Sequence, residues 1–584
     1  MSAPALASTS RSARSSVGRK LAAYNASPTQ ALALLVIALL LIAFLVVPIV
    51  RVIVVAFTGP AGGFSLVHFG DFFRTGLLRE SFWNSVYVGV MTVVVASLIA
   101  VPLATLLSRF QFRGAALIHT LGVLPLVMPP FVGAIAMQLI YGRNGTINLI
   151  LGDHFGFRIP FMEGLNGVIF VEALHYFPFI LLNLSASLAN IDTSMEESAQ
   201  NLGASGFTLF SRIVFPLALP GYVAGAALVF VKVFDDLATP LLLNVNAMLA
   251  PQAYLKITSV GIADPMGYVI SVIMICAALG AMAISTLALR HIDFATTQRG
   301  GGGLGRRSLG RFGNTVAAVF VVLILLLVLS PHIGIFLLSI GTVWSFAELP
   351  DGYTLAHYAT VFSEAQGLIG NTVLYCGLAG LIDVIIGAVL AYLVLRTRLP
   401  GRKLVEQVAL AAVAVPGLVL GIGLLRTYYD VHLPFTDVPF ATFWLMLVIA
   451  YAVRRLPYAL TAATAALRQL HLSLEEAAEN LGAGKLSTLS RIVVPLVTGG
   501  LFAGFVTSFA TAAVELSATL LLVASERDAP ISYGIYVYMQ SAAGRGPGAA
   551  LGVIAVVTVA IATYCAYRLS ERERDRRSRG GLAV

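Results

Sequence analysis

The sequence predicts an all-α integral membrane protein with about 12 transmembrane helices, arranged as two tandem homologous six-helix units. Composition is the first observation behind this fold class. Of 584 residues, 58% are hydrophobic and 11% are charged, and the mean hydropathy is +0.89. That is too little charge to cover the surface of a soluble protein. The second observation is an ordered internal repeat, which is described below.

Apolar runs of about 20 residues or more recur along the chain, and a helix needs roughly that length to cross about 30 Å of hydrocarbon. The first run is too long for the core of a cleaved signal peptide, which spans about 7–15 residues, so we expect an uncleaved first helix. In chain order the expected spans are 31–57, 84–108, 115–142, 164–190, 212–238, 263–290, 313–340, 371–396, 403–428, 440–468, 491–523 and 547–568.

The chain divides into a disordered cytoplasmic N-terminal tail, two six-helix units joined by a cytoplasmic linker, and a basic cytoplasmic C-terminal tail. The linker is rich in glycine and arginine, which favours flexibility. A glycine-rich phosphate cradle would need a strand–loop–helix context and a following Gly-Lys-Ser/Thr, and the sequence around the linker has neither. The expected boundaries are 1–30, 31–290, 291–312, 313–568 and 569–584.

The net charge of +9 does not indicate nucleic-acid binding, because the arginines lie in short segments between apolar runs. Basic residues in such segments set the orientation of a membrane protein. The N-terminal tail, the 109–114 turn, the linker, the 396–403 turn and the C-terminal run are all basic, whereas the 341–370 loop has no Lys or Arg. The positive-inside rule then places both termini in the cytoplasm.

The three cysteines lie far apart within apolar runs, so their spacing indicates neither a metal site nor a disulfide framework. Burial among apolar neighbours is the expected role of such thiols. The three are Cys276, Cys376 and Cys565.

The same motif stands near the end of each half. We call residues 194–217 the first cassette and residues 473–496 the second cassette; matching positions differ by 279, whereas matches further upstream differ by 287. The first half therefore carries about eight extra residues, which we expect in the 143–163 loop. An ordered set of such matches indicates duplication. Matched pairs include Glu197 with Glu476, Gly203 with Gly482, Pro216 with Pro495, Arg109 with Arg396 and Pro129 with Pro416.

Each cassette has the features of a short helix followed by a bend. A serine followed by paired glutamates is typical of an N-cap and a first helical turn. Gly203 or Gly482 then breaks or bends the helix, and Pro216 or Pro495 opens the next span, where the missing amide proton is harmless. Both cassettes lie on the side that the basic residues mark as cytoplasmic. We expect each cassette to be a rigid exposed segment to which another protein binds.

The pattern Glu-Ala-Ala-x3-Gly-x9-Ile-x2-Pro resembles the signature loop of bacterial ABC-importer permeases, whose coupling helix docks in a groove on a cytoplasmic ATPase. The second cassette fits fully, and the first has Ser198 in place of an alanine. The resemblance covers essentially the whole chain as two fused permease units of the type I ABC importer fold. The residues that it assigns to ATPase coupling are Glu196, Glu197, Ala199, Gly203, Ile213, Pro216, Glu475, Glu476, Ala477, Ala478, Gly482, Ile492 and Pro495.

The resemblance implies a transport subunit of the bacterial inner membrane and not an enzyme. Its partners would be two copies of a cytoplasmic ABC ATPase, an extracytoplasmic solute-binding protein and membrane lipid, with no nucleic acid. The ATPase would bind ATP and Mg, and this chain would hold no cofactor or metal. Residues 481–487 look like a phosphate loop, but Leu486 stands where Ser or Thr holds magnesium, and Glu479 stands where the first glycine belongs.

Ionisable residues within spans are costly and are candidates for function. Asp236 aligns with Glu515 near the outer end of the fifth span of each half, so we expect these carboxylates to face each other. Lys232 would neutralise Asp236, and Asp383 would be the partner of the adjacent arginines Arg454 and Arg455. The alternative role is a set of salt bridges between the halves, or arginines that snorkel to the surface. The pathway and gate candidates are Asp235, Asp236, Glu515, Arg454, Arg455, His175 and Asp383, and Glu172 is a further buried acid.

Among fused permeases the chain looks most like the iron(III) importers, on length, the double cassette and the run Glu515–Leu522. The run Asp235–Pro240 is less typical of that pattern, and Arg454 with Arg455 suits an anion. We therefore favour iron(III), while a phosphonate or sugar-phosphate anion, thiamine and polyamine stay open.

Two other classes of protein fit less well. A secondary transporter driven by an ion gradient also uses repeats and buried charges, but coupling helices have no purpose there. A membrane-embedded enzyme needs a nucleophile–base cluster or a metal motif, and the scattered histidines supply neither.

Overall fold

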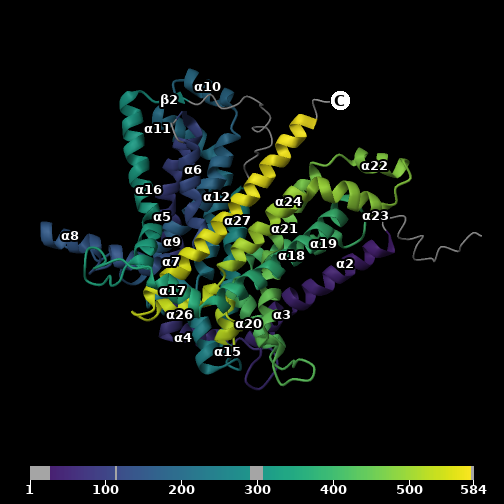
Figure 1. Ribbon diagram of the computed structural model, residues 1–584, viewed down its shortest axis with the longest axis horizontal. Coiled ribbons are helices and arrows are strands. Elements are labelled where there is room, and N and C mark those ends of the chain that lie inside the picture. Colours follow the sequence, from purple (N-terminus) through teal and green to yellow (C-terminus); the bar gives the residue numbers. More distant parts are fainter. Residues whose placement is uncertain (1–26, 112–114, 290–306, 581–584) are drawn as a thin grey trace, which may run out of the picture.

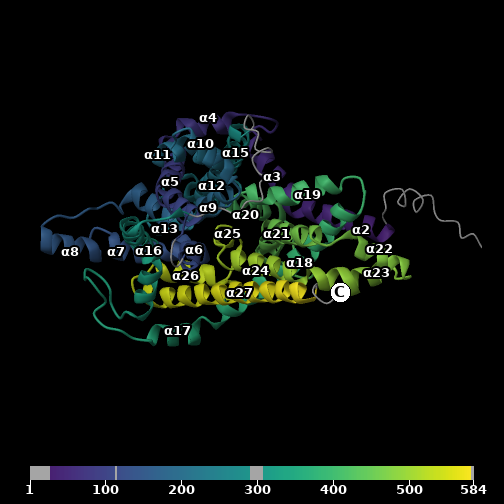
Figure 2. The same ribbon diagram turned by 90° about the horizontal axis from the view of Figure 1, so that it is seen from above.

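The computed structural model describes residues 27–111, 115–289 and 307–580, and in them the protein is built of helices in two halves (Figures 1 and 2). Within these ranges nine helices are long and apolar enough to cross a membrane, and two bent helix pairs raise the number to eleven. A shorter apolar helix covers Arg545–Ile561. These segments fall on the spans expected from the sequence, which confirms the all-α membrane fold.

The first half consists of six spans with short helices between them. In chain order its elements are α2 (Pro28–Leu41), η1 (Ile42–Val46), α3 (Val47–Ala56), α4 (Val67–Arg74), α5 (Gly76–Arg109), β1 (Phe110–Gln111), α6 (Ala115–Val123), η2 (Leu124–Val127), α7 (Pro130–Tyr141), α8 (Thr146–Phe155), α9 (Gly164–Ala189), α10 (Thr193–Asn201), α11 (Gly206–Leu209), η3 (Phe210–Val214), α12 (Phe215–Asp235), α13 (Ala238–Leu242), α14 (Leu249–Leu255), η4 (Lys256–Val260) and α15 (Pro265–Leu289).

The second half repeats this order. Its elements are β2 (Arg307–Ser308), α16 (Arg311–Ile340), α17 (Ala356–Glu364), α18 (Gln366–Arg396), α19 (Arg402–Ala411), η5 (Ala412–Ala414), α20 (Gly417–Tyr428), η6 (Phe440–Thr442), α21 (Trp444–Arg468), α22 (Leu472–Asn480), α23 (Lys485–Thr488), η7 (Leu489–Val493), α24 (Val494–Ala513), α25 (Thr519–Leu522), η8 (Glu526–Asp528), α26 (Ile531–Met539) and α27 (Arg545–Gly580).

The two ends of the chain differ in part from the expected tails. Helix α2 begins at Pro28, inside the range 1–30 assigned to a tail, and α27 continues to Gly580, through most of the range 569–584. Residues 1–26, most of the 291–312 linker and residues 581–584 lie outside the described residues.

The third span of each half is broken, whereas the sequence suggested the uninterrupted spans 115–142 and 403–428. The two parts of each span meet at 102° in the first half and at 111° in the second. Pro129 and Pro416 stand at the two breaks with ψ near 140°. A proline has no amide proton and disfavours helical angles in the residue before it, so the helix stops and restarts in a new direction.

The first span of each half packs against helices of the other half. Helix α3 packs on α20 of the second half as well as on α15 of its own, and α16 packs on α7 and α6 of the first half as well as on α27 of its own. Figure 1 shows this exchange directly: the purple α2 and α3 lie among the green helices, and the teal α16 lies beside the blue α5 and α6. Because each first span is held by the opposite half, the two halves cannot part completely without losing these contacts.

Glycines allow the fourth and fifth spans of each half to approach closely. A Cβ atom on Gly225 of α12 would come within 2.7 Å of the Ile180 Cα atom of α9. Its counterpart Gly504 of α24 also lies close to α21, since a Cβ atom on Gly504 would come within 3.1 Å of the Ala459 Cα atom. Small residues at such positions let membrane helices pack backbone to backbone. The fourth span of each half is thereby the buried centre of its unit.

The extra residues of the first half lie where the sequence placed them. The interval between α7 and α9 contains the additional helix α8, whereas the matching interval between α20 and α21 contains only the short η6. In both views α8 projects away from the rest of the molecule (Figures 1 and 2).

We predict that Gly225→Val weakens the protein by about 1–3 kcal/mol, because the larger side chain forces α9 and α12 apart. The measurement is thermal unfolding of the detergent-purified chain, followed by the loss of its monodisperse peak in size-exclusion chromatography. Gly280→Val is the matched control, because a Cβ atom on Gly280 meets nothing within 4 Å. Equal unfolding temperatures for the two variants would contradict the close approach.

Candidate functional site

Two copies of one local structure form the first candidate site. The helix α10 of the first cassette and the helix α22 of the second lie in the upper part of Figure 1, at the same side of the molecule. Each is followed by a single-turn helix, α11 or α23, then by a π-helical turn, η3 or η7, and then by the fifth span. The duplication seen in the sequence is therefore a duplication of structure.

A glycine ends each cassette helix by the same hydrogen bonds. Gly203 has φ +91° and Gly482 has φ +85°, in the left-handed region that favours glycine. The amide of Ala204 donates to the carbonyl of Ala199, and the amide of Gly203 donates to Gln200. The second cassette repeats this pair of bonds one for one. This is a Schellman motif, and it turns the chain sharply back toward the membrane.

The first glutamate of each pair is an internal anchor. Glu196 is 8% exposed and forms an ion pair with Arg109 at the end of α5. Glu475 is 7% exposed, and its Oε1 lies 2.6 Å from the Arg396 Nε atom at the end of α18. Arg396 also donates to the carbonyl oxygens of Leu467 and Leu470 at the end of α21. Each cassette helix is thereby fixed to the second span of its own half.

The remaining coupling candidates divide into buried and accessible groups. The side chains of Ala199 and Ala478 are buried beneath the helices, and those of Ile213 and Ile492 are half-buried. With Glu196 and Glu475, these residues hold the cassette together and do not present their side chains to a partner. The accessible candidates are Glu197, Glu476, Ala477, Gly203, Gly482, Pro216 and Pro495.

Sequence reasoning missed three exposed apolar side chains at the tips of the cassettes. Leu202 is 90% exposed and Leu481 is 89% exposed, each just before the capping glycine, and Phe207 is 80% exposed. The signal that could have identified the leucines is an apolar residue directly before the glycine of an otherwise polar segment. Apolar groups exposed at matching tips, on the polar side of a membrane protein, are typical of a protein interface.

The prolines of the cassettes stand at the start of an α-helix, as the sequence suggested, although that helix does not begin after a loop. Pro216 and Pro495 are the second residues of α12 and α24, and each of these helices continues directly from the π-helical turn before it. The wider turn of a π-helix removes the need for the amide hydrogen bond that proline lacks. The fifth span is therefore joined to the cassette without a hinge.

The N-caps also lie earlier than the cassette serines. Asp192 caps α10 by accepting a hydrogen bond from the amide of Ser194, at 2.9 Å, and His471 stands at the same position of α22. This backbone hydrogen bond lowers the pKa of the exposed Asp192 carboxyl, because it stabilises the charged form.

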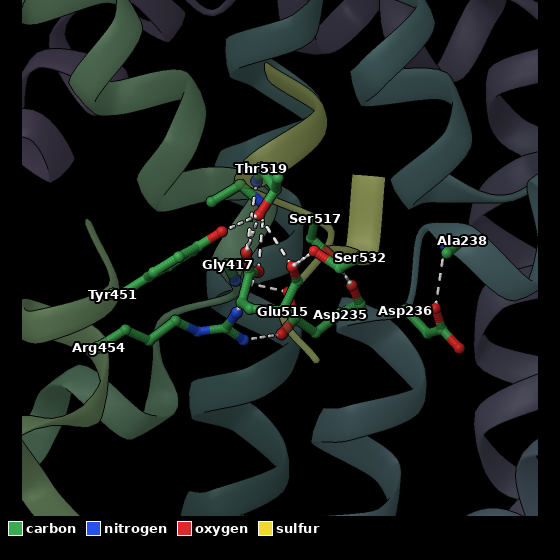
Figure 3. A network of polar contacts seen from close by, with 11 residues as sticks. Asp235, Asp236, Ala238, Gly417, Tyr451, Arg454, Glu515, Ser517, Thr519 and Ser532 are labelled. Atoms are coloured by element: carbon green, nitrogen blue, oxygen red, sulfur yellow. Dashed lines mark hydrogen bonds and ion pairs between the residues drawn. The ribbon is translucent and has the colours of Figure 1, made fainter. Parts of the chain in front are cut away.

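A second candidate site joins the two halves around Arg454 (Figure 3). Its guanidinium contacts the Asp235 carboxylate of the first half and lies 2.9 Å from Glu515 Oε1 of the second. The amide of Gly417 donates to Asp235 at 2.5 Å, and the Ser517 hydroxyl donates to the Asp235 carbonyl at 3.2 Å. Asp235 ends a continuous helix of 30 residues that starts beside the first cassette, about 45 Å away along its axis. The site therefore lies toward the opposite side from the cassettes.

The expectation that Asp236 faces Glu515 is wrong, because Asp235 occupies that place. The Asp236 carboxylate instead caps α13, accepting a bond from the amide of Ala238 at 3.0 Å (Figure 3). It also accepts a bond from the hydroxyl of Thr239. Glu515 makes the equivalent cap on α25 and contacts Arg454 as well. Two adjacent aspartates in the first half thus share the two contacts that one longer glutamate makes in the second.

The other buried candidates do not join this network. Asp383 forms no ion pair with Arg454, and it lies near Arg455 and the Ser508 hydroxyl. Glu172 is fully buried near Asp236, without a hydrogen-bond partner among the described residues. His175 lies near His332 and near Lys232 of α12.

The expected neutralisation of Asp236 by Lys232 is likewise wrong. Lys232 forms no ion pair within the part of the chain that the structure describes. Its neighbours in electrostatic range are Tyr458, Arg454, Arg455 and Asp235.

The comparison with known families agrees with this architecture. Residues 96–298 and 383–576 each match the family described as binding-protein-dependent transport system inner membrane component. The two matches cover more than half of the chain, one in each half. The chain belongs to this family and is the permease of an ABC importer, a multi-pass protein of the inner membrane.

Individual relatives refine the comparison. The chain is 27% identical to the putative ferric transport system permease protein FbpB 1 of Haemophilus influenzae over 459 residues, covering 76% of this chain and 70% of the relative. It is 27% identical to the ferric transport system permease protein FbpB of Actinobacillus pleuropneumoniae, over 77% of this chain and 65% of the relative. A shorter match, 39% identical over 134 residues, joins it to the molybdenum transport system permease protein ModB of Haemophilus influenzae, over 23% of this chain and 58% of the relative.

We predict that Arg396→Gln loosens α22 by about 2 kcal/mol, since the Glu475 ion pair lies between the exposed and the fully buried cases. That change is roughly 30-fold in the population of the locally opened cassette. Limited proteolysis between residues 471 and 490 measures it. Arg398→Gln removes an exposed charge two residues away and is the control. Equal cleavage rates for both variants would show that the ion pair does not hold the helix.

Proposed function

We propose that this permease is driven by a cytoplasmic ATPase, one copy of which docks on each cassette. The ATPase binds ATP and Mg²⁺, this chain holds no cofactor of its own, and a solute-binding protein delivers the cargo at the opposite face. In this arrangement both chain termini and both cassettes are cytoplasmic, as the basic segments of the sequence require.

One observation carries the proposal: the two cassettes are built alike and are each tied rigidly to the membrane spans. A buried ion pair holds each helix to the second span, and the helical segment that follows its glycine turn runs on into the fifth span. A force applied to the exposed tips at Leu202 and Leu481 is therefore transmitted to the spans that carry Asp235 and Glu515. Such rigid-body movement of two halves is the usual basis of alternating access.

The Arg454 network is our candidate for the gate on the side away from the cassettes. It is closed in this structure, because Arg454 holds carboxylates of both halves at once. Opening the pathway requires Asp235 to leave Arg454, while Glu515 stays on the same half as the arginine. An ion-gradient-driven secondary transporter also uses buried charges, but it has no use for twin cassettes outside the membrane.

Iron(III) is the cargo that we propose first. Two relatives matched over most of this chain, at 76% and 77% of its length, are ferric transport permeases by name. The molybdenum permeases match shorter regions, which keeps an oxyanion as the second candidate. Thiamine, polyamines and phosphonate-type anions have no comparable support among these relatives.

The proposal is tested by ATP-dependent uptake into proteoliposomes that contain this chain, its cognate ATPase and its binding protein, with iron(III) and molybdate as alternative cargoes. ATP-dependent accumulation of one cargo, absent without the ATPase, is the expected result. Uptake that follows an ion gradient and needs no ATPase would overturn the mechanism.

We predict that Gly203→Val together with Gly482→Val abolishes ATPase association. A β-branched residue at these positive φ angles costs about 1–3 kcal/mol at each site, so the Schellman turns and the leucine tips lose their positions. The measurement is co-purification of the ATPase with the membrane chain. Gly484→Val is the control, since Gly484 does not have a positive φ and a Cβ atom there meets nothing within 4 Å. Normal association of the double variant would remove the cassettes as docking sites.

A further inference from the structure

The Asp235 carboxylate sits in a place built by the other half. One oxygen contacts the Arg454 guanidinium, and the other accepts the Gly417 amide at 2.5 Å (Figure 3). Gly417 is the first residue of the 12-residue helix α20, whose N-terminus favours a negative charge. Asp235 is 8% exposed and Arg454 is 6% exposed, so water competes little for these contacts. We call this place the carboxylate seat.

Glycine is required for the seat to exist. A Cβ atom on Gly417 would lie 1.9 Å from the Arg454 Nη1 atom, so any other residue would displace the guanidinium from the amide. The first half has no equivalent. Its residue matching Gly417 is Pro130, which has no amide proton, and its residue matching Arg454 is His175. The pathway therefore contains one seat, contributed by the second half alone.

The seat becomes empty when the gate opens. Glu515 remains satisfied, because the amides of Ala518 and Thr519 donate to it and it lies on the same half as Arg454. Asp235 leaves with α12, and the amide of Gly417 and one side of the guanidinium then have no partner. A buried charge without a partner is strongly unfavourable. An incoming group with carboxylate-like oxygen atoms restores both contacts.

A second cation, Lys232, stands beside the seat and is not held in an ion pair within the described part of the chain. It lies one helical turn before Asp235 on α12, in electrostatic range of Tyr458, both arginines and Asp235 itself. The other buried acids near the seat lie next to other groups. Asp236 caps α13 and has Glu172 near it, and Asp383 lies near Arg455. Positive charge therefore exceeds the free negative charge around Lys232.

We propose that the cargo passes the gate as a small anion, which takes the place of Asp235 on Arg454 and Gly417. This inference rests on the proposed function and deepens it by naming the cargo class. Asp235 then acts as an internal competitor that closes the gate once the anion has moved on toward Lys232. Two sources share this chemistry: a free oxyanion, and a ferric ion enclosed in an oxygen-donor chelate with net negative charge.

The test uses the full-length purified chain, without its partners. Asp235→Ala vacates the seat, and binding is titrated with molybdate, phosphate, citrate and ferric citrate by calorimetry and by thermal shift. We expect saturable binding at least about tenfold tighter than in the unmodified chain, where Asp235 fills the seat. Saturation by molybdate or phosphate identifies a free oxyanion. Saturation by ferric citrate, with citrate alone without effect, identifies the chelate.

Two further variants make the outcome decisive. Asp236→Ala removes the same charge one residue away but leaves the seat filled, so it should bind no better than the unmodified chain. Adding Arg454→Gln to Asp235→Ala should abolish the gained affinity. Equal binding by all four proteins, or binding of none of the anions to a monodisperse Asp235→Ala protein, would overturn the inference. ATPase association is measured separately on the same proteins, so loss of that association identifies failure of the proposed function instead.

Discussion

One buried arginine holds the two halves of this permease together on the side away from the cassettes. Arg454 contacts a carboxylate from each half, in a region where a lone charge is very costly. The contacts around it follow from that cost: an amide at a helix start satisfies Asp235, and a capped helix satisfies Glu515. Removing any of these groups leaves a charge in a medium that cannot solvate it.

The rest of the fold allows that contact to open without the molecule falling apart. The exchanged first spans clasp the opposite halves, while glycine-lined contacts keep the fourth and fifth spans of each half together. Each half can then move as a body, turned by the cassette that is joined to it through a continuous helix. In the mechanism that we propose, docking and gating thus occur at opposite ends of the same rigid elements.

The sequence predicted the helices and the cassettes well, because apolar runs and an exact repeat are local signals. It did not predict the details that depend on three-dimensional neighbours. The amino-acid sequence alone does not distinguish Asp235 from Asp236, because the point at which α12 ends decides which carboxylate turns toward Arg454. Similarly, the sequence predicted that Glu196 and Glu475 couple to the ATPase. In the structure an arginine at the end of the second span forms an ion pair with each of them. The sharp breaks at Pro129 and Pro416 needed the packing of α7 and α20 to give them a direction.

The one-sided seat has a consequence for how such a protein is encoded. Two identical subunits related by a twofold axis would place two arginines and two glutamates at the centre, and like charges would meet across the axis. A covalently joined pair can instead diverge, so that one partner keeps the cation and the other supplies only an acid. His175 and Pro130 are the first-half residues at the positions of Arg454 and Gly417. Fusion of the halves thus permits an asymmetric charge arrangement at their interface, which a symmetric homodimer cannot form.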